Sequence, residues 1–297
     1  MSLAEQQAAL LPPQLIAKLE RLELVTRKIF RGRMKGERRS KRKGQSVEFA
    51  DFRNYVPGDD LRHIDWNLFA RLEKLFLRLF LEEEDLRFYA LIDTSSSMQF
   101  GSPSKLDHAR QIAAALAYIG LCRADRVKVE SLATSLRAAP QAFRGKHQSW
   151  RMVETIGQLP VANISLLQGV RNFCLRNPGK GILVLISDLM DKEGFDAALR
   201  FLGAQQLDVY VIHLLSQEEL DPDVKGDLKL IDCEDQDEAE ITVSGPLLEK
   251  YKATVASFIE SARDFCHRRG MSYLMASTQM PVDDLVGSYL RRRGLVR

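Results

Sequence analysis

Residues 87–98 read RFYALIDTSSSM, an apolar run that ends in Asp93 and is followed by a serine-rich segment. A second apolar run, GILVLIS at residues 181–187, ends in Asp188. Continuous apolar runs of this length are typical of strands that are buried on both faces of a parallel sheet. Helical patterns lie between the runs, and strands that alternate with helices predict an α/β fold. We therefore expect a doubly wound, mostly parallel sheet that is flanked by helices.

The other expected elements come from the same two periodicities. We predict further strands at residues 75–81, 127–132, 207–215 and 272–276, and a hairpin formed by residues 228–232 and 240–243. We predict helices at residues 105–122, 148–159, 166–175, 195–202, 247–269 and 282–292. The sequence shows no internal repeat, so a single large α/β domain accounts for residues 86–297.

Two shorter parts precede this domain. Residues 1–45 contain a helical pattern at residues 14–30 and a basic arm at residues 27–43, which carries a single acid, Glu37. Residues 46–85 are rich in aromatic and β-branched residues around a Pro-Gly-Asp-Asp turn, which predicts a short β extension.

Composition indicates a soluble globular protein. The chain has 297 residues, of which 45% are hydrophobic and 28% are charged, and its formal net charge is +3. Such a composition supports a sizeable core, and so small a net charge does not by itself require a polyanionic partner.

Cysteine usage and the N-terminus favour a cytoplasmic location. The four cysteines, Cys122, Cys174, Cys233 and Cys266, show no CxxC spacing, which favours buried thiols in a reducing compartment. The N-terminal residues lack the basic and apolar regions of a signal peptide. No apolar run approaches the roughly 18 residues that a membrane-spanning helix needs.

The ends of the two apolar strands predict a cation site. Asp93 and Asp188 follow strands at the same edge of the sheet, and Ser95 and Ser97 occupy alternate positions after Asp93. Ligand sites of doubly wound sheets form at the carboxyl ends of strands where the strand order reverses. Two hydroxyls and two carboxylates form an all-oxygen site that suits a hard cation such as Mg²⁺. The same DxSxS pattern also suits a loop whose serines cap a helix.

Two segments carry a resemblance to known families. Residues 93–98, DTSSSM, resemble the metal-ion-dependent adhesion motif (DxSxS) of von Willebrand factor A domains. Residues 52–85, FRNYVPGDDLRHIDWNLFARLEKLFLRLFLEEED, are similar to the signature of the domain-of-unknown-function 58 family, bacterial proteins with such an A-like domain. The matching positions are Arg53, Tyr55, Pro57, Gly58, Asp59, Asp60, Arg62, Ile64, Asp65, Trp66, Ala70 and Arg71. The resemblance continues through SDLMD at residues 187–191, the predicted hairpin and the LRRRG segment near the C-terminus.

The resemblance assigns roles at the strand ends. Asp93, Ser95 and Ser97 match the first part of the adhesion motif, and Asp188 matches a later aspartate that often reaches the metal through water. Ile164 stands where the motif has a threonine, and isoleucine is not a ligand. Asn163, Ser165 or a water would have to substitute. The implied cation is Mg²⁺, with Mn²⁺ and Ca²⁺ as alternatives.

The resemblance implies a binding function rather than catalysis. A carboxylate of a partner protein can fill an open coordination position of such a cation. Family members are commonly encoded beside MoxR-type AAA+ ATPases and are thought to act with them as adaptors in assembling or activating a client protein. The chain has no GxxxxGK[ST] sequence, so the partner would use the ATP.

Enzymatic functions fit the sequence less well than this interpretation. A metal-dependent hydrolase could use the same carboxylates, but the sequence offers no obvious general base or nucleophile beside them. A phosphatase of the haloacid dehalogenase type would need an aspartate where Ser95 stands, and a serine hydrolase would need a GxSxG elbow.

The acidic block and the basic arm each have a second interpretation. Asp59, Asp60, His63 and Asp65 could form an active site, but we expect Arg53, Arg62 and Arg71 to pair with these acids and Tyr55 and Trp66 to pack the block against the A-like domain. The basic arm could contact nucleic acid through phosphates, but it contains few aromatics, so a solvated or partner-binding arm is the expectation.

Overall fold

The computed structural model describes residues 10–25, 48–81, 86–224, 226–231, 238–292 and 294–297. The chain divides into two compact units, a larger unit of Met1–Lys28 with Leu86–Arg297 and a smaller unit of Ile29–Asp85. The predicted basic arm at residues 27–43 and residues 232–237 of the predicted hairpin lie outside the described residues.

The larger unit is built on a sheet of five strands in the order β4-β3-β5-β6-β9. The strands are β3 (Arg87–Ile92), β4 (Arg126–Ser131), β5 (Gly181–Ser187), β6 (Leu207–Leu215) and β9 (Ser272–Ser277). Every neighbouring pair is parallel, which confirms the predicted α/β architecture. After β3 the chain goes outward to β4 and then crosses back to the other side of β3 to form β5. The strand order therefore reverses between β3 and β5.

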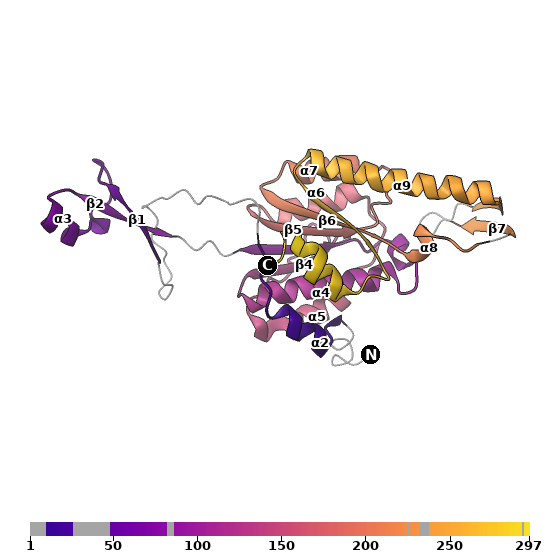
Figure 1. Cartoon of the computed structure of the whole chain (residues 1–297), viewed down its shortest axis with the longest axis horizontal. Coiled ribbons are helices and arrows are strands. Elements are labelled where there is room, and N and C mark those ends of the chain that lie inside the picture. Colours follow the sequence, from indigo (N-terminus) through magenta and orange to yellow (C-terminus); the bar gives the residue numbers. More distant parts are fainter. Residues whose placement is uncertain (1–9, 26–47, 82–85, 225, 232–237, 293) are drawn as a thin grey trace. The chain divides into compact units, whose positions relative to one another are not determined.

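Helices cover both faces of this sheet (Figure 1). On one face lie α2 (Pro13–Leu19), α4 (Lys105–Cys122), α5 (Ser149–Gly157), α10 (Val282–Asp284) and the π-helix η4 (Leu285–Leu290). On the other face lie α6 (Leu166–Arg176), α7 (Asp196–Gly203) and α9 (Gly245–Arg268).

Alternation along β5 connects the strand to both helical layers. Ile182, Val184 and Ile186 pack in the core on the α4 face, whereas Leu183 and Leu185 pack in the core on the α6 face. Successive side chains of a strand point to opposite faces, so a strand covered on both faces must be apolar throughout. The burial of all seven residues of β5 follows from this constraint.

The N-terminal segment differs from its prediction. The helix expected over residues 14–30 ends at Leu19, and Leu24 instead forms an antiparallel bridge with Val296. The Tyr118 hydroxyl of α4 donates to the Glu20 carboxylate at 3.0 Å. The described part of this segment thus belongs to the larger unit, because its leucines are buried against α4.

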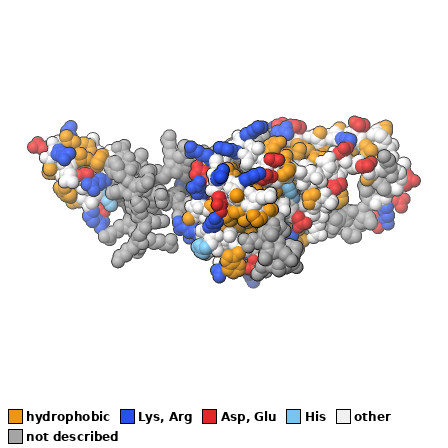
Figure 2. Space-filling model, turned by 60° about the horizontal axis from the view of Figure 1, so that its bottom comes forward, with side chains coloured by type: hydrophobic (Ala, Val, Ile, Leu, Met, Phe, Trp, Pro, Cys, Tyr) orange, Lys and Arg blue, Asp and Glu red, His pale blue; other side chains and the backbone are white. Residues whose placement is uncertain are grey.

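Further short elements belong to the larger unit. They are the 3₁₀ turns η2 (Ser96–Gln99) and η3 (Lys146–Gln148), α8 (Gln217–Leu220), and a hairpin of β7 (Gly226–Ile231) with β8 (Glu238–Val243). The two hairpin strands pair antiparallel, as the sequence predicts. On the face shown in Figure 2, basic side chains of the described residues are interspersed with acidic and apolar ones.

The smaller unit contains the predicted β extension. Its strands β1 (Glu48–Asn54) and β2 (Phe76–Leu81) pair antiparallel, and η1 (Leu61–His63) and α3 (Trp66–Leu72) lie between them in sequence. Asp65 caps α3 by accepting hydrogen bonds from the backbone N–H groups of Asn67 and Leu68, both at 3.0 Å. Aspartate is among the favoured residues at this position because it satisfies free N–H groups of the first turn.

Three acids of this unit, Asp59, Asp60 and Asp65, are held in ion pairs. Arg53 pairs with Asp59 at 2.8 Å, and the Arg62 side chain binds both carboxylate oxygens of Asp60. Arg53 and Arg62 thus pair with acids of this block, as expected.

Asp65 instead binds Arg78 at 2.8 Å, an arginine that is not among the three expected partners. Hydrogen bonds from the arginines are the main cause that lowers the pKa of Asp59, Asp60 and Asp65. Trp66 is 59% exposed and packs edge-on against Phe69 of its own helix. Its contact with the larger unit stays a prediction.

Replacing Leu185 by alanine tests how far the fold depends on the doubly buried strand. Leu185 has no exposed surface, so the variant should lose about 2–5 kcal/mol of unfolding free energy through the cavity that it leaves. Leu175→Ala is the matched control, because Leu175 is 68% exposed on α6 and should change stability by less than about 0.5 kcal/mol. Urea denaturation followed by circular dichroism measures the stability of both variants. Equal urea midpoints would contradict the assignment of Leu185 to the buried core.

Candidate functional site

The candidate site lies where β3 and β5 end side by side, at the reversal of strand order. Ile92 pairs with Ile186, and one residue further the backbone N–H of Asp93 donates to the Ile186 carbonyl at 2.8 Å. Asp93 and Ser187 therefore come next to each other on the same face of the sheet. Crevices at such a reversal are the usual ligand sites of open α/β sheets.

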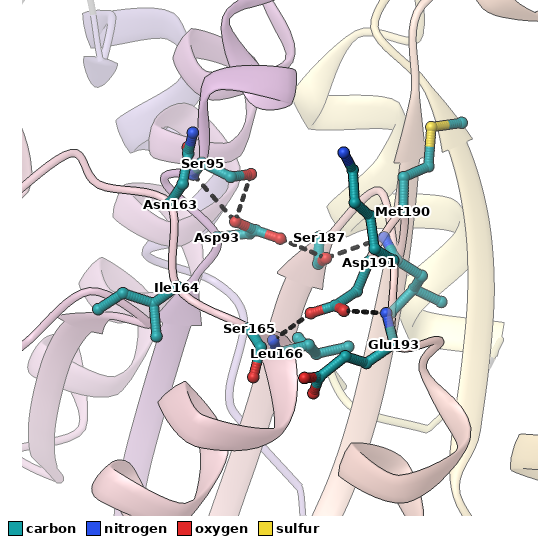
Figure 3. Close-up of a pocket in the computed structure, with 12 residues that line it drawn as sticks. Asp93, Ser95, Asn163, Ile164, Ser165, Leu166, Ser187, Met190, Asp191 and Glu193 are labelled. Carbon is teal, nitrogen blue, oxygen red and sulfur yellow. Dashed lines mark hydrogen bonds between the residues drawn. The ribbon is translucent and has the colours of Figure 1, made fainter. Parts of the chain in front are cut away.

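The Asp93 carboxylate is the centre of a cluster of hydroxyl groups (Figure 3). Its Oδ1 accepts from the Ser95 backbone N–H at 3.0 Å and from Ser95 Oγ at 2.8 Å. Its Oδ2 accepts from Ser187 Oγ at 2.7 Å. The hydroxyls of Ser95 and Ser97 lie 3.0 Å apart. The structure thus brings together three of the four predicted ligands and adds Ser187, which the sequence analysis did not select.

The fourth predicted ligand, Asp188, has its carboxylate bound elsewhere. Its Oδ2 accepts from Lys105 Nζ at 2.7 Å, and its Oδ1 accepts from the Met190 backbone N–H at 3.1 Å. The cause is the alternation of side chains at the strand end: Ser187 points to the face of Asp93, so Asp188 turns toward α4 on the other face. Asp188 is 1% exposed and does not line the pocket described below.

Lys105 is the main residue that the sequence analysis missed. Its side chain is completely buried at the start of α4, and it binds Glu219 of α8 at 2.5 Å in addition to Asp188. Burial acts to lower the pKa of Lys105, but the two carboxylates outweigh it and the net shift is upward, so the ammonium group stays charged. The only sequence signal was a lysine in the first helical turn, where the helix dipole disfavours a cation.

The loop before α6 holds the serine-rich segment in place. Asn163 Oδ1 accepts from the Ser96 backbone N–H at 2.8 Å, and the Thr94 hydroxyl donates to the Pro160 carbonyl at 2.7 Å. Ser165 caps α6 by accepting from the Gln168 N–H at 3.4 Å. Both candidates for the place of the missing threonine thus already have structural partners. Ile164 lines the pocket, and its side chain extends away from the Asp93 carboxylate (Figure 3).

A pocket of about 250 Å³ opens beside Asp93. Its lining comes from the loops after β3 and β5 and from the start of α6: Asp93, Ser95, Asn163, Ile164, Ser165, Leu166, Ser187, Leu189, Met190, Asp191, Lys192 and Glu193. The second carboxylate in this lining that is bound by backbone groups is Asp191, which accepts from the N–H groups of Leu166 and Glu193. Asp191 therefore ties the loop after β5 to the N-terminus of α6.

Electrostatics and spacing both suit a small cation. Burial first, and then the nearby Asp188 carboxylate, raise the pKa of Asp93, while the hydrogen bonds from Ser187 and Ser95 oppose the rise. A bound cation would offset the cost of burying the charged Asp93 carboxylate and its repulsion by Asp188. Neighbouring oxygens around an octahedral Mg²⁺ lie about 3.0 Å apart if each bond is about 2.1 Å. The Asp93–Ser95 and Ser95–Ser97 oxygen separations of 2.8 and 3.0 Å fit this geometry.

Such a cation would be held by hydroxyls more than by charged groups. Within the described ranges, no group of three or more His, Cys, Asp or Glu residues is arranged to hold a metal ion. Of the predicted ligands, the structure brings together one carboxylate, that of Asp93, with the hydroxyls of Ser95 and Ser97.

His213 is a buried neighbour of the site. It pairs in register with Ser187, and its Nδ1 lies 2.6 Å from the Tyr273 hydroxyl. Burial lowers the pKa of His213 to about 4. Its Nε2 is buried and has no hydrogen-bond partner among the described residues. His213 does not line the pocket, so it is not placed to act as a base there.

Together these features define an α/β domain with an oxygen-lined cleft at the reversal point of a parallel sheet. The chain matches the family model described as "Protein of unknown function DUF58" over residues 51–260, which is more than half of its length. It therefore belongs to the DUF58 family.

Relatives were found in two mycobacteria. Uncharacterized proteins of Mycobacterium bovis and Mycobacterium tuberculosis are 27% identical to the chain over 252 residues, covering 82% of this chain and 79% of theirs. No helix in the described part of the chain is long and apolar enough to cross a membrane.

Three solved structures show weak similarity. BatB from Bacteroides thetaiotaomicron matches with 12% identity and a TM-score of 0.40, covering 70% of this chain and 98% of that one. An aerotolerance-related membrane protein from Bacteroides fragilis matches with 14% identity and a TM-score of 0.40, covering 71% and 98%. The pilus adhesin SpaC from Lactobacillus rhamnosus matches with 10% identity and a TM-score of 0.42, covering 72% and 30%.

The buried state of His213 predicts a pH dependence of stability. The folded-state pKa of about 4 lies below the unfolded value of 6.5, so the unfolded chain binds the proton first as the pH falls. The stability is therefore fully present above pH 6.5 and decreases by about 3 kcal/mol between pH 6.5 and 4. His213→Leu should lack this part of the decrease, measured as unfolding free energy against pH.

A histidine at the surface provides the control for this measurement. His147 is exposed, so His147→Gln should reproduce the pH profile of the unmodified protein. If the His213→Leu profile runs parallel to that of the unmodified protein between pH 6.5 and 4, His213 is not buried in its neutral form.

Proposed function

We propose that this protein is a non-enzymatic interaction module with a von Willebrand factor A-like domain, which binds a protein partner through a cation at Asp93, Ser95 and Ser97. The observation that carries the proposal is the oxygen cluster at the reversal point between β3 and β5, with separations of 2.8 and 3.0 Å. Mg²⁺ is the proposed ion, and Mn²⁺ or Ca²⁺ would use the same oxygens.

The arrangement supports adhesion because these side chains fill only part of a coordination shell. Asp93 would supply the negative charge, and its orientation is fixed by Ser187 and by the Ser95 N–H. The hydroxyls of Ser95 and Ser97 would supply neutral oxygens. A hard cation takes six or more oxygens, so the remaining positions would be left for water and for a carboxylate of the partner.

The pocket also favours binding of a side chain over conversion of a substrate. Its volume of about 250 Å³ is below the roughly 300–1,000 Å³ of typical small-molecule sites. Its lining contains no histidine or cysteine, and both oxygens of Asp191 already accept backbone N–H groups. A hydrolase would need a base or nucleophile that faces the cation.

We further propose that the partner complex contains a MoxR-type AAA+ ATPase together with a client protein, in the cytoplasm. Two points support this proposal: membership of the DUF58 family and the resemblance of the Asp93–Ser97 segment to the adhesion motif. The sequence has no P-loop, so the energy of ATP would come from the ATPase rather than from this chain.

Direct cation binding is the first test. Calorimetric titration with Mg²⁺ should show one site in the unmodified protein and none in Asp93→Asn, which keeps the shape of the side chain but removes its charge. Ser97→Ala should weaken binding at least about tenfold, because a hard cation loses one of its oxygen ligands. Glu193→Gln is the matched control, since it removes an exposed acid from the same pocket and should bind like the unmodified protein.

A pull-down tests the proposed partner. All incubations should contain Mg²⁺, because the ATPase itself needs the ion, and the comparison should be between the unmodified protein, Asp93→Asn and Glu193→Gln. We expect an AAA+ ATPase, identified by mass spectrometry, with the first and third proteins only. Equal recovery with all three would overturn the cation-dependent interaction.

A further inference from the structure

The Lys105 ammonium group lies in a buried charge cluster directly beside the proposed site. Its Nζ binds Asp188 Oδ2 at 2.7 Å and Glu219 Oε1 at 2.5 Å, and the lysine side chain has no exposed surface. Asp188 follows Ser187, whose hydroxyl donates to Asp93. The lysine thus holds the carboxylate that the adhesion motif would place near the metal.

The ion pair between Lys105 and Asp188 reduces the negative charge near Asp93. Asp93 and Asp188 follow the paired ends of β3 and β5, and as carboxylates they would together supply two negative charges. Two such charges attract a divalent cation strongly. In the structure the Lys105 ammonium binds both Asp188 and Glu219 and so offsets part of this charge, and of the two strand-end aspartates only Asp93 lines the pocket.

We infer that Lys105 is a positioning residue that keeps the cation affinity of the site low by holding Asp188 in a buried ion pair. This inference rests on the proposed function and adds its regulation. The site then binds a cation firmly only when a second negative group lies beside Asp93. This group is either a carboxylate of the partner or Asp188 after its release from Lys105.

Glu219 connects this ion pair to the elements that surround it. Its carboxylate accepts from the Ser216 N–H at 2.7 Å in the capping box of α8, and its carbonyl accepts from the Tyr251 hydroxyl of α9 at 2.9 Å. The adjacent Glu218 accepts from the N–H of Ser102, which follows the serine-rich segment, at 3.3 Å. A displacement of α8 would therefore change how Lys105 is shared between Glu219 and Asp188.

Two substitutions with opposite expected effects test the inference, with Mg²⁺ alone as the probe in calorimetry. Lys105→Met frees the charge of Asp188, so the Mg²⁺ affinity should rise at least about tenfold, as expected for removing a unit charge in a poorly screened environment. Glu219→Gln leaves the lysine charge balanced by Asp188 alone, so the affinity should fall severalfold. Glutamine keeps the acceptor oxygen of the α8 capping box.

Lys252→Met is the matched control, because this exposed lysine is also in an ion pair, with Asp221, but does not line the pocket. Solvent and salt screen an exposed charge, so the affinity should change by less than about threefold. An equal rise in Lys252→Met and Lys105→Met would overturn the inference, since removing a lysine outside the buried cluster would then have the same effect. Circular dichroism shows which variants are folded, and if Lys105→Met is unfolded, Glu219→Gln decides: weaker binding supports the inference, and unchanged binding overturns it.

The outcomes separate this inference from the proposed function. If Asp93→Asn abolishes binding while both ion-pair variants bind like the unmodified protein, the cation site stands and the role of Lys105 falls. If the unmodified protein binds no Mg²⁺ but Lys105→Met does, the inference is supported in its strongest form. If none of these proteins binds Mg²⁺, both the proposed site and the inference are overturned.

Discussion

The parallel pairing of β3 with β5 is the constraint on which the rest of the structure depends. It places two strand ends together where the strand order reverses, and the last step of the pairing, from the Asp93 N–H to the Ile186 carbonyl, fixes the backbone at 2.8 Å. The serine-rich segment then has a rigid starting point. Sites built on strand ends are held more accurately than sites on free loops, which suits a cluster whose oxygens must lie about 3 Å apart.

The same strands decide which side chains meet. Alternation sends Ser187 to the face of Asp93 and Asp188 to the face of α4, so two adjacent residues serve two different clusters. One is open to the pocket and contains hydroxyls. The other is closed and contains a lysine between two acids. The proposed cation site and the ion pair that is proposed to lower its affinity therefore both depend on the end of β5.

Much of this organisation could be predicted from sequence, because it follows from periodicity. The two continuous apolar runs predict β3 and β5. The motif DTSSSM predicts Asp93, Ser95 and Ser97 as site residues, and their side chains do come together. The position of Asp188 could not be predicted in the same way. Its residue type and its place after a strand were recognised, but its direction depends on the pairing register and on a lysine that is distant in sequence. Similarly, Asp65 binds Arg78 of β2, which was not among the expected arginines, since the bridge between Ile64 and Leu77 brings Arg78 beside Asp65.

Stability alone does not explain the buried lysine. Removing a lysine and two carboxylates from water costs several kcal/mol per ion, and well-packed apolar residues of similar size would often be as stable or more so. What an apolar residue could not do is fix the direction of Asp188 and cancel its charge beside Asp93. The ion pair is thus better explained by its effect on the neighbouring site than by a contribution to folding.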